Sequence, residues 1–218
     1  MENPDRLAQC VEQLQSDGLV AFPTETVWGL AARADSGQAL ARLASVKGRD
    51  SSKPISILVP GSFCLEALGF EVPDLAERLM VAHWPGPLTL VLRCRRAFAP
   101  GIARLDGAVG VRCSSHPAAS ALARAAFDAE LGPLTATSLN RSGDPPARTR
   151  AEARKLCEAV GSGERIPLYD AGFEAGGEEP STVLDVTGDV PRVLRAGAVQ
   201  GIPEADSESA VHADKESN

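Results

Sequence analysis

The sequence predicts an α/β (α+β) fold, in which helices flank a twisted mixed β-sheet. Short apolar segments alternate with longer segments of helical spacing, and no segment repeats another, which is typical of a sheet covered by helices. The chain has 218 residues, of which 44% are hydrophobic, so it can bury one sizeable core. Only 4% of the residues are aromatic, and Ala, Val and Leu must therefore fill most of that core.

The N-terminal part begins with a helix, a strand and a second helix. A cap residue, a first-turn proline and a first-turn acid occupy positions 3–5, and Gly18 ends the first helix. Leu19–Phe22 follows as a short buried strand. Ser36 caps the second helix, and Lys47 lies at its C-terminal end, where the helix dipole favours a cation.

The rest of the chain continues this alternation. Apolar runs bounded by turn residues predict further strands, at Ile55–Val59, Pro87–Arg93, Val109–Arg112, Pro133–Ser138, Ile166–Asp170, Thr182–Val186 and Arg192–Leu194. Helical spacing predicts further helices, at Pro73–His83, His116–Ala129 and Thr149–Val160. From about Ile202 the chain is acidic and lacks apolar periodicity, so we expect one domain over residues 1–201 and a disordered tail over 202–218.

Composition argues against several classes of protein. The formal net charge of −7 disfavours a protein that coats nucleic acid, because such binding draws its energy from neutralised phosphates. Five cysteines lie far apart without a CxxC or Cys/His cluster, so we expect reduced, buried thiols and no structural zinc. There is no leader-like N-terminus and no apolar run approaching ~18 residues. We therefore expect a cytoplasmic protein without membrane contact.

The strongest functional signal is a pair of segments, Ala21–Leu30 and Lys47–Pro54. The first ends an apolar strand in a turn rich in hydroxyl groups, and the second places Lys47, Arg49 and Lys53 within seven residues. Hydroxyl groups beside clustered cations suit a polyanion such as a nucleoside triphosphate. A solvated basic turn at a helix end is the alternative interpretation.

Other candidate ligand-binding side chains follow predicted strands, where open sheets bind ligands. They are Thr24, Thr26, Arg112, Ser138, Asn140, Ser181, Thr182 and Arg195. If these strand ends meet, one crevice collects cations and short hydroxyl or amide side chains. The phosphate loop GxxxxGK[ST] is absent from the sequence, so side chains would have to hold a nucleotide.

Familiar nucleophile arrangements are weakly supported. His83 lies among apolar helix positions and His116 precedes Pro117, which favours packing and helix capping over catalysis. Glu25 is a carboxylate inside the first motif, and it could equally form a salt bridge with a nearby cation. Nucleotidyl or phosphoryl transfer fits this inventory best, because it needs positioning and charge neutralisation rather than a protein nucleophile.

Eight motifs in one order carry a family resemblance. They are Pro23–Leu30, Lys47-x-Arg49, Lys53-Pro54, Trp84–Thr89, Val111-Arg112, Ser138-x-Asn140, Ser181–Val183 and Leu194-Arg195-x-Gly197. On these motifs the chain resembles the YrdC-like family, the threonylcarbamoyl-AMP synthases, from about Gly18 to Gly197. The resemblance is to the single-domain form of the family.

The resemblance implies a YrdC-like fold with a central basic cavity and an L-threonylcarbamoyladenylate synthase activity. It implies L-threonine, bicarbonate (or CO2) and ATP with Mg²⁺ as reactants, and no organic cofactor. The product would pass to the downstream tRNA threonylcarbamoyl transferase machinery, for N6-threonylcarbamoyladenosine in ANN-decoding tRNAs. A weak contact with tRNA is also part of this expectation.

The resemblance also implies roles for individual residues. The threonine-binding residues would be Thr26, Arg112 and Ser181. The ATP-binding residues would be Arg49, Lys53, Ser138, Asn140 and Arg195, with Lys47 and Arg49 as the catalytic cations that stabilise charge on the pyrophosphate.

Two positions depart from the family pattern. Leu58 stands where some relatives carry a histidine that touches threonine, and Leu139 is bulkier than the usual alanine of the serine turn. Both departures bear on substrate affinity rather than on the type of reaction.

Two alternatives to the synthase are an RNA-binding YrdC-like module and a paralogue without synthase activity. An RNA-binding module should show a broad basic face with exposed aromatic residues. The net charge of −7 and the nine aromatic residues do not favour that alternative.

Overall fold

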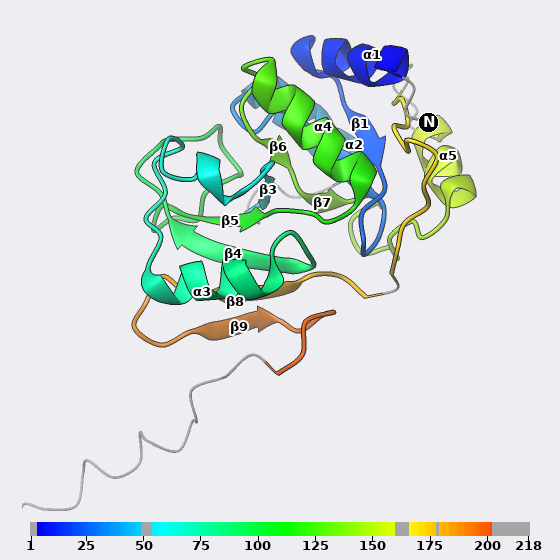
Figure 1. Cartoon of the computed structure of the whole chain (residues 1–218). Coiled ribbons are helices and arrows are strands. Elements are labelled where there is room, and N and C mark those ends of the chain that lie inside the picture. Colours follow the sequence, from blue (N-terminus) through cyan, green and yellow to red (C-terminus); the bar gives the residue numbers. More distant parts are fainter. Residues whose placement is uncertain (1–3, 49–53, 160–165, 178, 202–218) are drawn as a thin grey trace, which may run out of the picture.

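The computed structural model describes residues 4–48, 54–159, 166–177 and 179–201. Within these ranges it confirms each of the predicted helices (Figure 1). They are α1 (Pro4–Gln15), α2 (Gly37–Lys47), α3 (Asp74–His83), α4 (Pro117–Asp128) and α5 (Arg150–Glu158), with a short 3-10 helix at Ser62–Cys64. None of these helices is long and apolar enough to cross a lipid bilayer.

Side-chain caps explain where α2, α4 and α5 start. Ser36 Oγ accepts a backbone N–H from the first turn of α2 at 3.1 Å, and Nδ1 of His116 does the same for α4 at 3.2 Å, which confirms the capping role of His116. Thr149 and Glu152 form a reciprocal capping box on α5. Gly48 ends α2 at φ 55°, a left-handed conformation that favours glycine.

The strands form two sheets rather than the single expected sheet. Their bounds are β1 (Val20–Phe22), β2 (Gly29–Ala31), β3 (Ile57–Leu58), β4 (Leu88–Arg93), β5 (Ala108–Arg112), β6 (Leu134–Thr135), β7 (Thr137–Ser138), β8 (Thr182–Asp185) and β9 (Arg192–Arg195). A small antiparallel sheet has the order β1-β2-β7, and a larger mixed sheet has the order β6-β3-β5-β4-β8-β9. The mixed α/β class is therefore confirmed.

Two strand predictions need correction, and one strand was not predicted. The predicted strand Pro133–Ser138 is two strands, because the chain leaves the larger sheet after Thr135 and enters the smaller one at Thr137. Ile166–Asp170 is not a strand, since it meets β1 in a single bridge between Leu168 and Ala21. Gly29–Ala31, expected within a turn, is strand β2, because pairing with β1 and β7 outweighs the low strand propensity of glycine.

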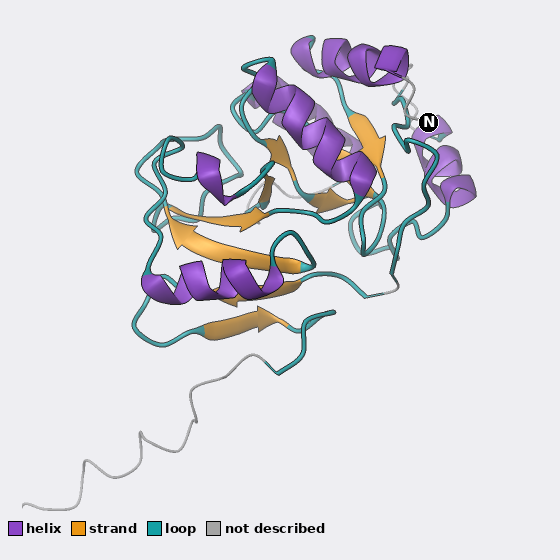
Figure 2. Cartoon of the chain, viewed as in Figure 1, coloured by secondary structure: helices purple, strands orange, loops and turns teal. Residues whose placement is uncertain are grey.

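The helices bury their apolar faces on both sides of the strands. Side chains of α1 and α4, which lie side by side in Figure 1, pack together with residues of β1 to form one hydrophobic cluster. Leu79 and Met80 of α3 pack against a larger cluster that includes Leu88 and Leu90 of β4. Figure 2 shows α3 and α4 on the outside of the strands. This packing fixes the strands in place, and it leaves the strand ends free to build a site.

Candidate functional site

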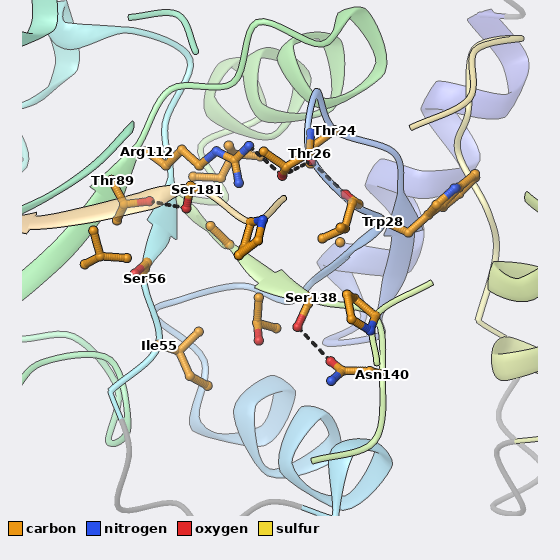
Figure 3. Close-up of a pocket in the computed structure, with 18 of the residues that line it drawn as sticks. Thr24, Thr26, Trp28, Ile55, Ser56, Thr89, Arg112, Ser138, Asn140 and Ser181 are labelled. Atoms are coloured by element: carbon orange, nitrogen blue, oxygen red, sulfur yellow. Dashed lines mark hydrogen bonds between the residues drawn. The ribbon is translucent and has the colours of Figure 1, made fainter. Parts of the chain in front are cut away.

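A cavity of about 470 Å³ opens where the two sheets meet. The loop between β1 and β2, the turn after β7 and five strands of the larger sheet all contribute to its wall. Figure 3 shows Thr24 and Thr26 on one side, Thr89 and Ser181 on another, and Ser138 with Asn140 on a third.

Strand register explains how residues far apart in the sequence reach this cavity. Leu58, Arg112, Thr89, Val183 and Arg195 pair in one row across β3, β5, β4, β8 and β9, and all five line the cavity. Side chains in one such row share a face of the sheet. The neighbouring row, which alternates to the core face, consists of Ile57, Val111, Leu90 and Leu184.

Arg112 is the most buried of the cavity arginines, with 8% of its surface exposed. Its Nη2 donates to Thr26 Oγ1 at 2.9 Å and lies 3.0 Å from Oε1 of Glu25. The Glu25 contact is an ion pair without hydrogen-bond direction, since this oxygen has no hydrogen-bond partner. The Nε–H of Arg112 is also buried without a partner in the described part of the chain, so Arg112 keeps a donor for a second anion.

Glu25 is an internal counter-charge for Arg112. Its Oε2 accepts a hydrogen bond from the Ser114 hydroxyl. Burial alone would raise the pKa of Glu25, but Arg112 and the Ser114 hydrogen bond outweigh burial and lower this pKa below its ordinary value. The salt-bridge interpretation of Glu25 is therefore confirmed, and the ionised carboxylate orients the guanidinium.

The hydroxyl groups of Thr24 and Thr26 form an ordered chain. Thr24 donates to the Val27 carbonyl at 2.7 Å, and its oxygen lies 2.8 Å from that of Thr26. Because the Thr24 proton is already used, Thr26 must donate to Thr24. Thr26 then accepts from Arg112 and has one lone pair left, which suits a ligand that donates, such as an amine.

The segment Gly176-Gly177 packs against the backbone of this turn. Gly177 donates its N–H to the Thr26 carbonyl at 3.0 Å, and Gly176 donates to the Thr24 carbonyl at 2.9 Å. A Cβ atom at Gly177 would lie 2.7 Å from the Glu25 carbonyl oxygen. Only glycine allows this close approach. The two hydrogen bonds from the glycine segment can therefore form, and they hold the backbone of the Thr24–Thr26 turn in place.

Ser181 joins two other members of the row. Its Oγ lies 2.9 Å from Thr89 Oγ1, and Arg195 donates to the Ser181 hydroxyl at 2.9 Å and to its carbonyl at 2.8 and 3.0 Å. Desolvation and then repulsion from Arg112 lower the pKa of Arg195. Arg195 is still exposed at the cavity rim, which weakens both effects, and it remains a cation.

Lys47 holds the polar turn that follows β7. Its ammonium group donates to the carbonyl oxygens of Ser138 and Asn140 at 2.5 and 3.2 Å and to Asn140 Oδ1 at 2.9 Å. The Ser138 hydroxyl donates to the same Oδ1 at 2.7 Å. These hydrogen bonds from one ammonium group to three acceptors fix the geometry of the turn.

The structure thus brings most of the predicted site residues into one cavity. Those among its lining residues are Thr24, Thr26, Lys47, Arg112, Ser138, Asn140, Ser181 and Arg195. Thr182 is not among them, because its hydroxyl pairs with the backbone of Val199. Arg49 and Lys53 lie outside the described residues, and their roles stay predictions.

The two departures from the family pattern have different settings. Leu58 lines the cavity beside Arg112 in the row, so it presents methyl groups to a ligand rather than a hydrogen-bonding group. Leu139 is 3% exposed, belongs to the main hydrophobic core and does not line the cavity. Its extra bulk is accommodated by the core.

Among the cavity residues that the sequence analysis did not identify as candidates, Thr89 and Arg148 bear most on the site. Thr89 closes the Trp84–Thr89 motif, but its place next to Arg112 depends on the pairing of β4 with β5. Arg148 lines the cavity and follows the polar turn by a few residues, behind Pro145 and Pro146. Its position shortly after the Ser138-x-Asn140 motif is the feature of the sequence that could have identified it as a cavity residue.

Comparison with known proteins identifies the family of the chain. Residues 12–197 match the family model of Sua5, YciO and YrdC, which carries the description telomere recombination. A threonylcarbamoyl-AMP synthase of Chromohalobacter salexigens is 35% identical over 185 residues, which make up 85% of this chain and 95% of the relative. One of Bacillus subtilis is 36% identical over 200 residues, or 90% of this chain and 55% of the relative.

A solved structure has the same fold. It is Pyrococcus abyssi Sua5 complexed with L-threonine, which matches with a TM-score of 0.77 at 33% identity. The match covers 88% of this chain and 54% of that one. The chain therefore spans about half the length of the Bacillus and Pyrococcus relatives and nearly all of the Chromohalobacter relative.

Proposed function

The chain belongs to the Sua5/YciO/YrdC family, and on that premise we propose that it is a threonylcarbamoyl-AMP synthase. It makes threonylcarbamoyl-AMP and pyrophosphate from L-threonine, bicarbonate or CO2, and ATP. One observation carries the proposal: Arg112, Ser138, Ser181 and Arg195 line a single cavity, and the buried Nε–H of Arg112 has no partner among the described residues. The cavity can therefore hold a carboxylate and a nucleotide at the same time.

L-Threonine occupies the deep part of the cavity. Its carboxylate takes the remaining donor edge of Arg112, while Glu25 holds the other side of the guanidinium. Its amine donates to Thr26, whose hydroxyl retains an acceptor lone pair. Its side chain lies near Ser181, where the Thr89 and Arg195 contacts fix the direction of the hydroxyl.

ATP enters as its magnesium complex. Ser138 and Asn140 bind it from the turn that Lys47 holds, and Arg195 binds it from the opposite rim. Arg49 and Lys53, outside the described residues, belong to the same set. Together these groups neutralise the charge of the triphosphate.

The reaction proceeds in two steps, carbamate formation and adenylate formation. The threonine amine attacks the carbon of CO2, and loss of a proton from nitrogen gives a carbamate. A carbamate oxygen then attacks the α-phosphorus of ATP as the bond from that phosphorus to the bridging oxygen breaks, and pyrophosphate leaves. The protein supplies positioning and charge stabilisation rather than a nucleophile.

The product feeds N6-threonylcarbamoyladenosine formation in ANN-decoding tRNAs. The adenylate is an activated acyl donor, so a separate transferase machinery must consume it on tRNA. We place the enzyme in the cytoplasm with that machinery, and direct contact with tRNA is at most weak because the chain carries a net charge of −7.

An amino-acid panel tests the proposed function. With ATP and bicarbonate, threonine should support rapid pyrophosphate release, serine should support a slower reaction and valine should be poor. Valine keeps the amine that binds Thr26 but leaves the buried Ser181 hydroxyl without the threonine hydroxyl, a loss of ~1–3 kcal/mol or about 5- to 150-fold in kcat/KM. Equal rates with valine and threonine would mean that the cavity recognises shape alone. RNA binding without any release would support the RNA-binding alternative.

Thr89 should act through Ser181. Thr89→Val keeps the shape of the side chain and removes the hydroxyl that lies 2.9 Å from Ser181 Oγ. We expect KM for threonine to rise about 2- to 12-fold, as for one hydrogen bond of ~0.5–1.5 kcal/mol, while KM for ATP stays unchanged. Thr89→Ser should restore the wild-type value. A parallel rise of both KM values would show a general loss of packing instead.

A further inference from the structure

Four cationic side chains of the described residues line the cavity: Lys47, Arg112, Arg148 and Arg195. Lys47 donates to the polar turn, Arg112 to Thr26, and Arg195 to Ser181. The guanidinium of Arg148 makes no hydrogen bond or ion pair with any residue that the structure describes. Arg148 thus differs from the other three cavity cations: backbone hydrogen bonds and, to a smaller extent, the charge of Arg148 lower the pKa of the nearby Glu152, but the Arg148 guanidinium makes no direct contact of this kind within the described residues.

The backbone of Arg148 is nevertheless rigidly placed. The preceding residue, Ala147, is 2% exposed; it donates to the Leu139 carbonyl at 2.9 Å and accepts from Trp28 N–H at 3.0 Å. The N–H of Arg148 donates to Oε2 of Glu152 at 2.8 Å, as part of the cap of α5. Because the backbone is fixed, a ligand that binds the Arg148 guanidinium has to order the side chain only.

The neighbours of Arg148 indicate which ligand it would meet. The same stretch of the cavity wall includes Asn140, Ser142, Gly143 and Pro146, which belong to the polar turn or follow it directly. These side chains are small or polar, and Arg148 is exposed. An exposed guanidinium beside such a turn pays little desolvation and suits a charged, hydrated group rather than an apolar one.

We propose that Arg148 is a polyphosphate-binding residue, which closes onto the terminal phosphates of the nucleotide bound at the Ser138–Asn140 turn. The inference rests on the proposed function and extends it by assigning a cation that no motif of the chain includes. The planar fork of Arg148 can bind two phosphate oxygens at once. As pyrophosphate leaves, it stabilises the charge that builds on these oxygens.

The test compares charge removal at two exposed arginines. Arg148→Gln removes the proposed contact, and Arg154→Gln on α5 is the matched control, because Arg154 is exposed and does not line the cavity. We expect Arg148→Gln to lower kcat/KM for ATP about 10- to 100-fold, as for one charge-assisted hydrogen-bonding group. Its KM for threonine and its melting temperature should stay at wild-type values. Arg148→Lys should recover part of the loss, because lysine keeps the charge without the fork.

Calorimetric titration with MgATP, without threonine, separates this inference from the proposed function. Weaker binding by Arg148→Gln than by Arg154→Gln supports the polyphosphate contact even if the reaction is not the proposed one. Equal affinities and equal kcat/KM values for ATP in the two variants overturn the Arg148 proposal. Wild-type enzyme that binds ATP but releases no pyrophosphate with threonine overturns the proposed function instead.

Discussion

Arg112→Met is expected to reduce threonine-dependent pyrophosphate release severely. It removes the buried donor that the threonine carboxylate would take, and the loss of one such contact lowers the rate by about 10²–10³-fold. It also leaves Glu25 buried without its cation, which should cost ~3–5 kcal/mol of folding stability. Steady-state kinetics and thermal unfolding of the variant measure both effects.

A double variant separates the two effects. Combining Arg112→Met with Glu25→Gln removes both buried charges, so most of the stability should return while the activity should not. The Ser114 hydroxyl, which donates to the Glu25 carboxylate in the wild type, can still donate to the amide oxygen that the second substitution introduces. A stable double variant with wild-type turnover would show that Arg112 serves the fold and not the substrate.

Lys47→Met should have the second largest effect, on nucleotide use and stability together. The change leaves two carbonyl oxygens and one amide oxygen of the Ser138–Asn140 turn without their donor. We expect a loss of about 3 kcal/mol in unfolding free energy, together with a marked rise in KM for ATP. Chemical denaturation measures the unfolding free energy, and steady-state kinetics measure KM for ATP.

Lys47 could position the turn or contact the leaving pyrophosphate, and the two roles predict different results for this variant. If Lys47 mainly positions the turn, stability and ATP affinity fall together. If it contacts the leaving pyrophosphate directly, kcat falls while stability is kept. Lys155→Met is the control, since Lys155 is exposed on α5 and does not line the cavity. A Lys47→Met enzyme as stable and as active as this control would rule out both roles.

Local signals predicted the helices well. The caps at Ser36, His116 and Thr149 lie next to the helices that they start, so the sequence contains both parts of each interaction. The same holds for the left-handed stop at Gly48. Such short-range interactions depend little on the rest of the fold.

Long-range pairing explains what the sequence could not predict. Gly29–Ala31 becomes a strand because β7, more than a hundred residues later, pairs with it. Ile166–Asp170 has strand composition but meets β1 at one bridge only. The role of Thr89 depends on a register that sets it beside Arg112 and close to Ser181, and no local pattern contains that register.

For the site, the family motifs indicated most of the cavity residues but not their partners. The Ser138-x-Asn140 motif predicted a binding turn, whereas the three hydrogen bonds from Lys47 that hold it appear only in the fold. Arg148 lies outside every motif and is assigned by its place in the cavity.

The central claim is that this one cavity joins threonine, inorganic carbon and ATP into an adenylate. Its most direct test is to incubate the enzyme with isotopically labelled bicarbonate, L-threonine and MgATP, and to follow the nucleotide product by mass spectrometry. We predict an adenylate that contains both threonine and the labelled carbon, formed in equal amount to pyrophosphate and absent when any one reactant is omitted. Pyrophosphate release without labelled adenylate, or an adenylate that lacks the labelled carbon, would contradict the claim.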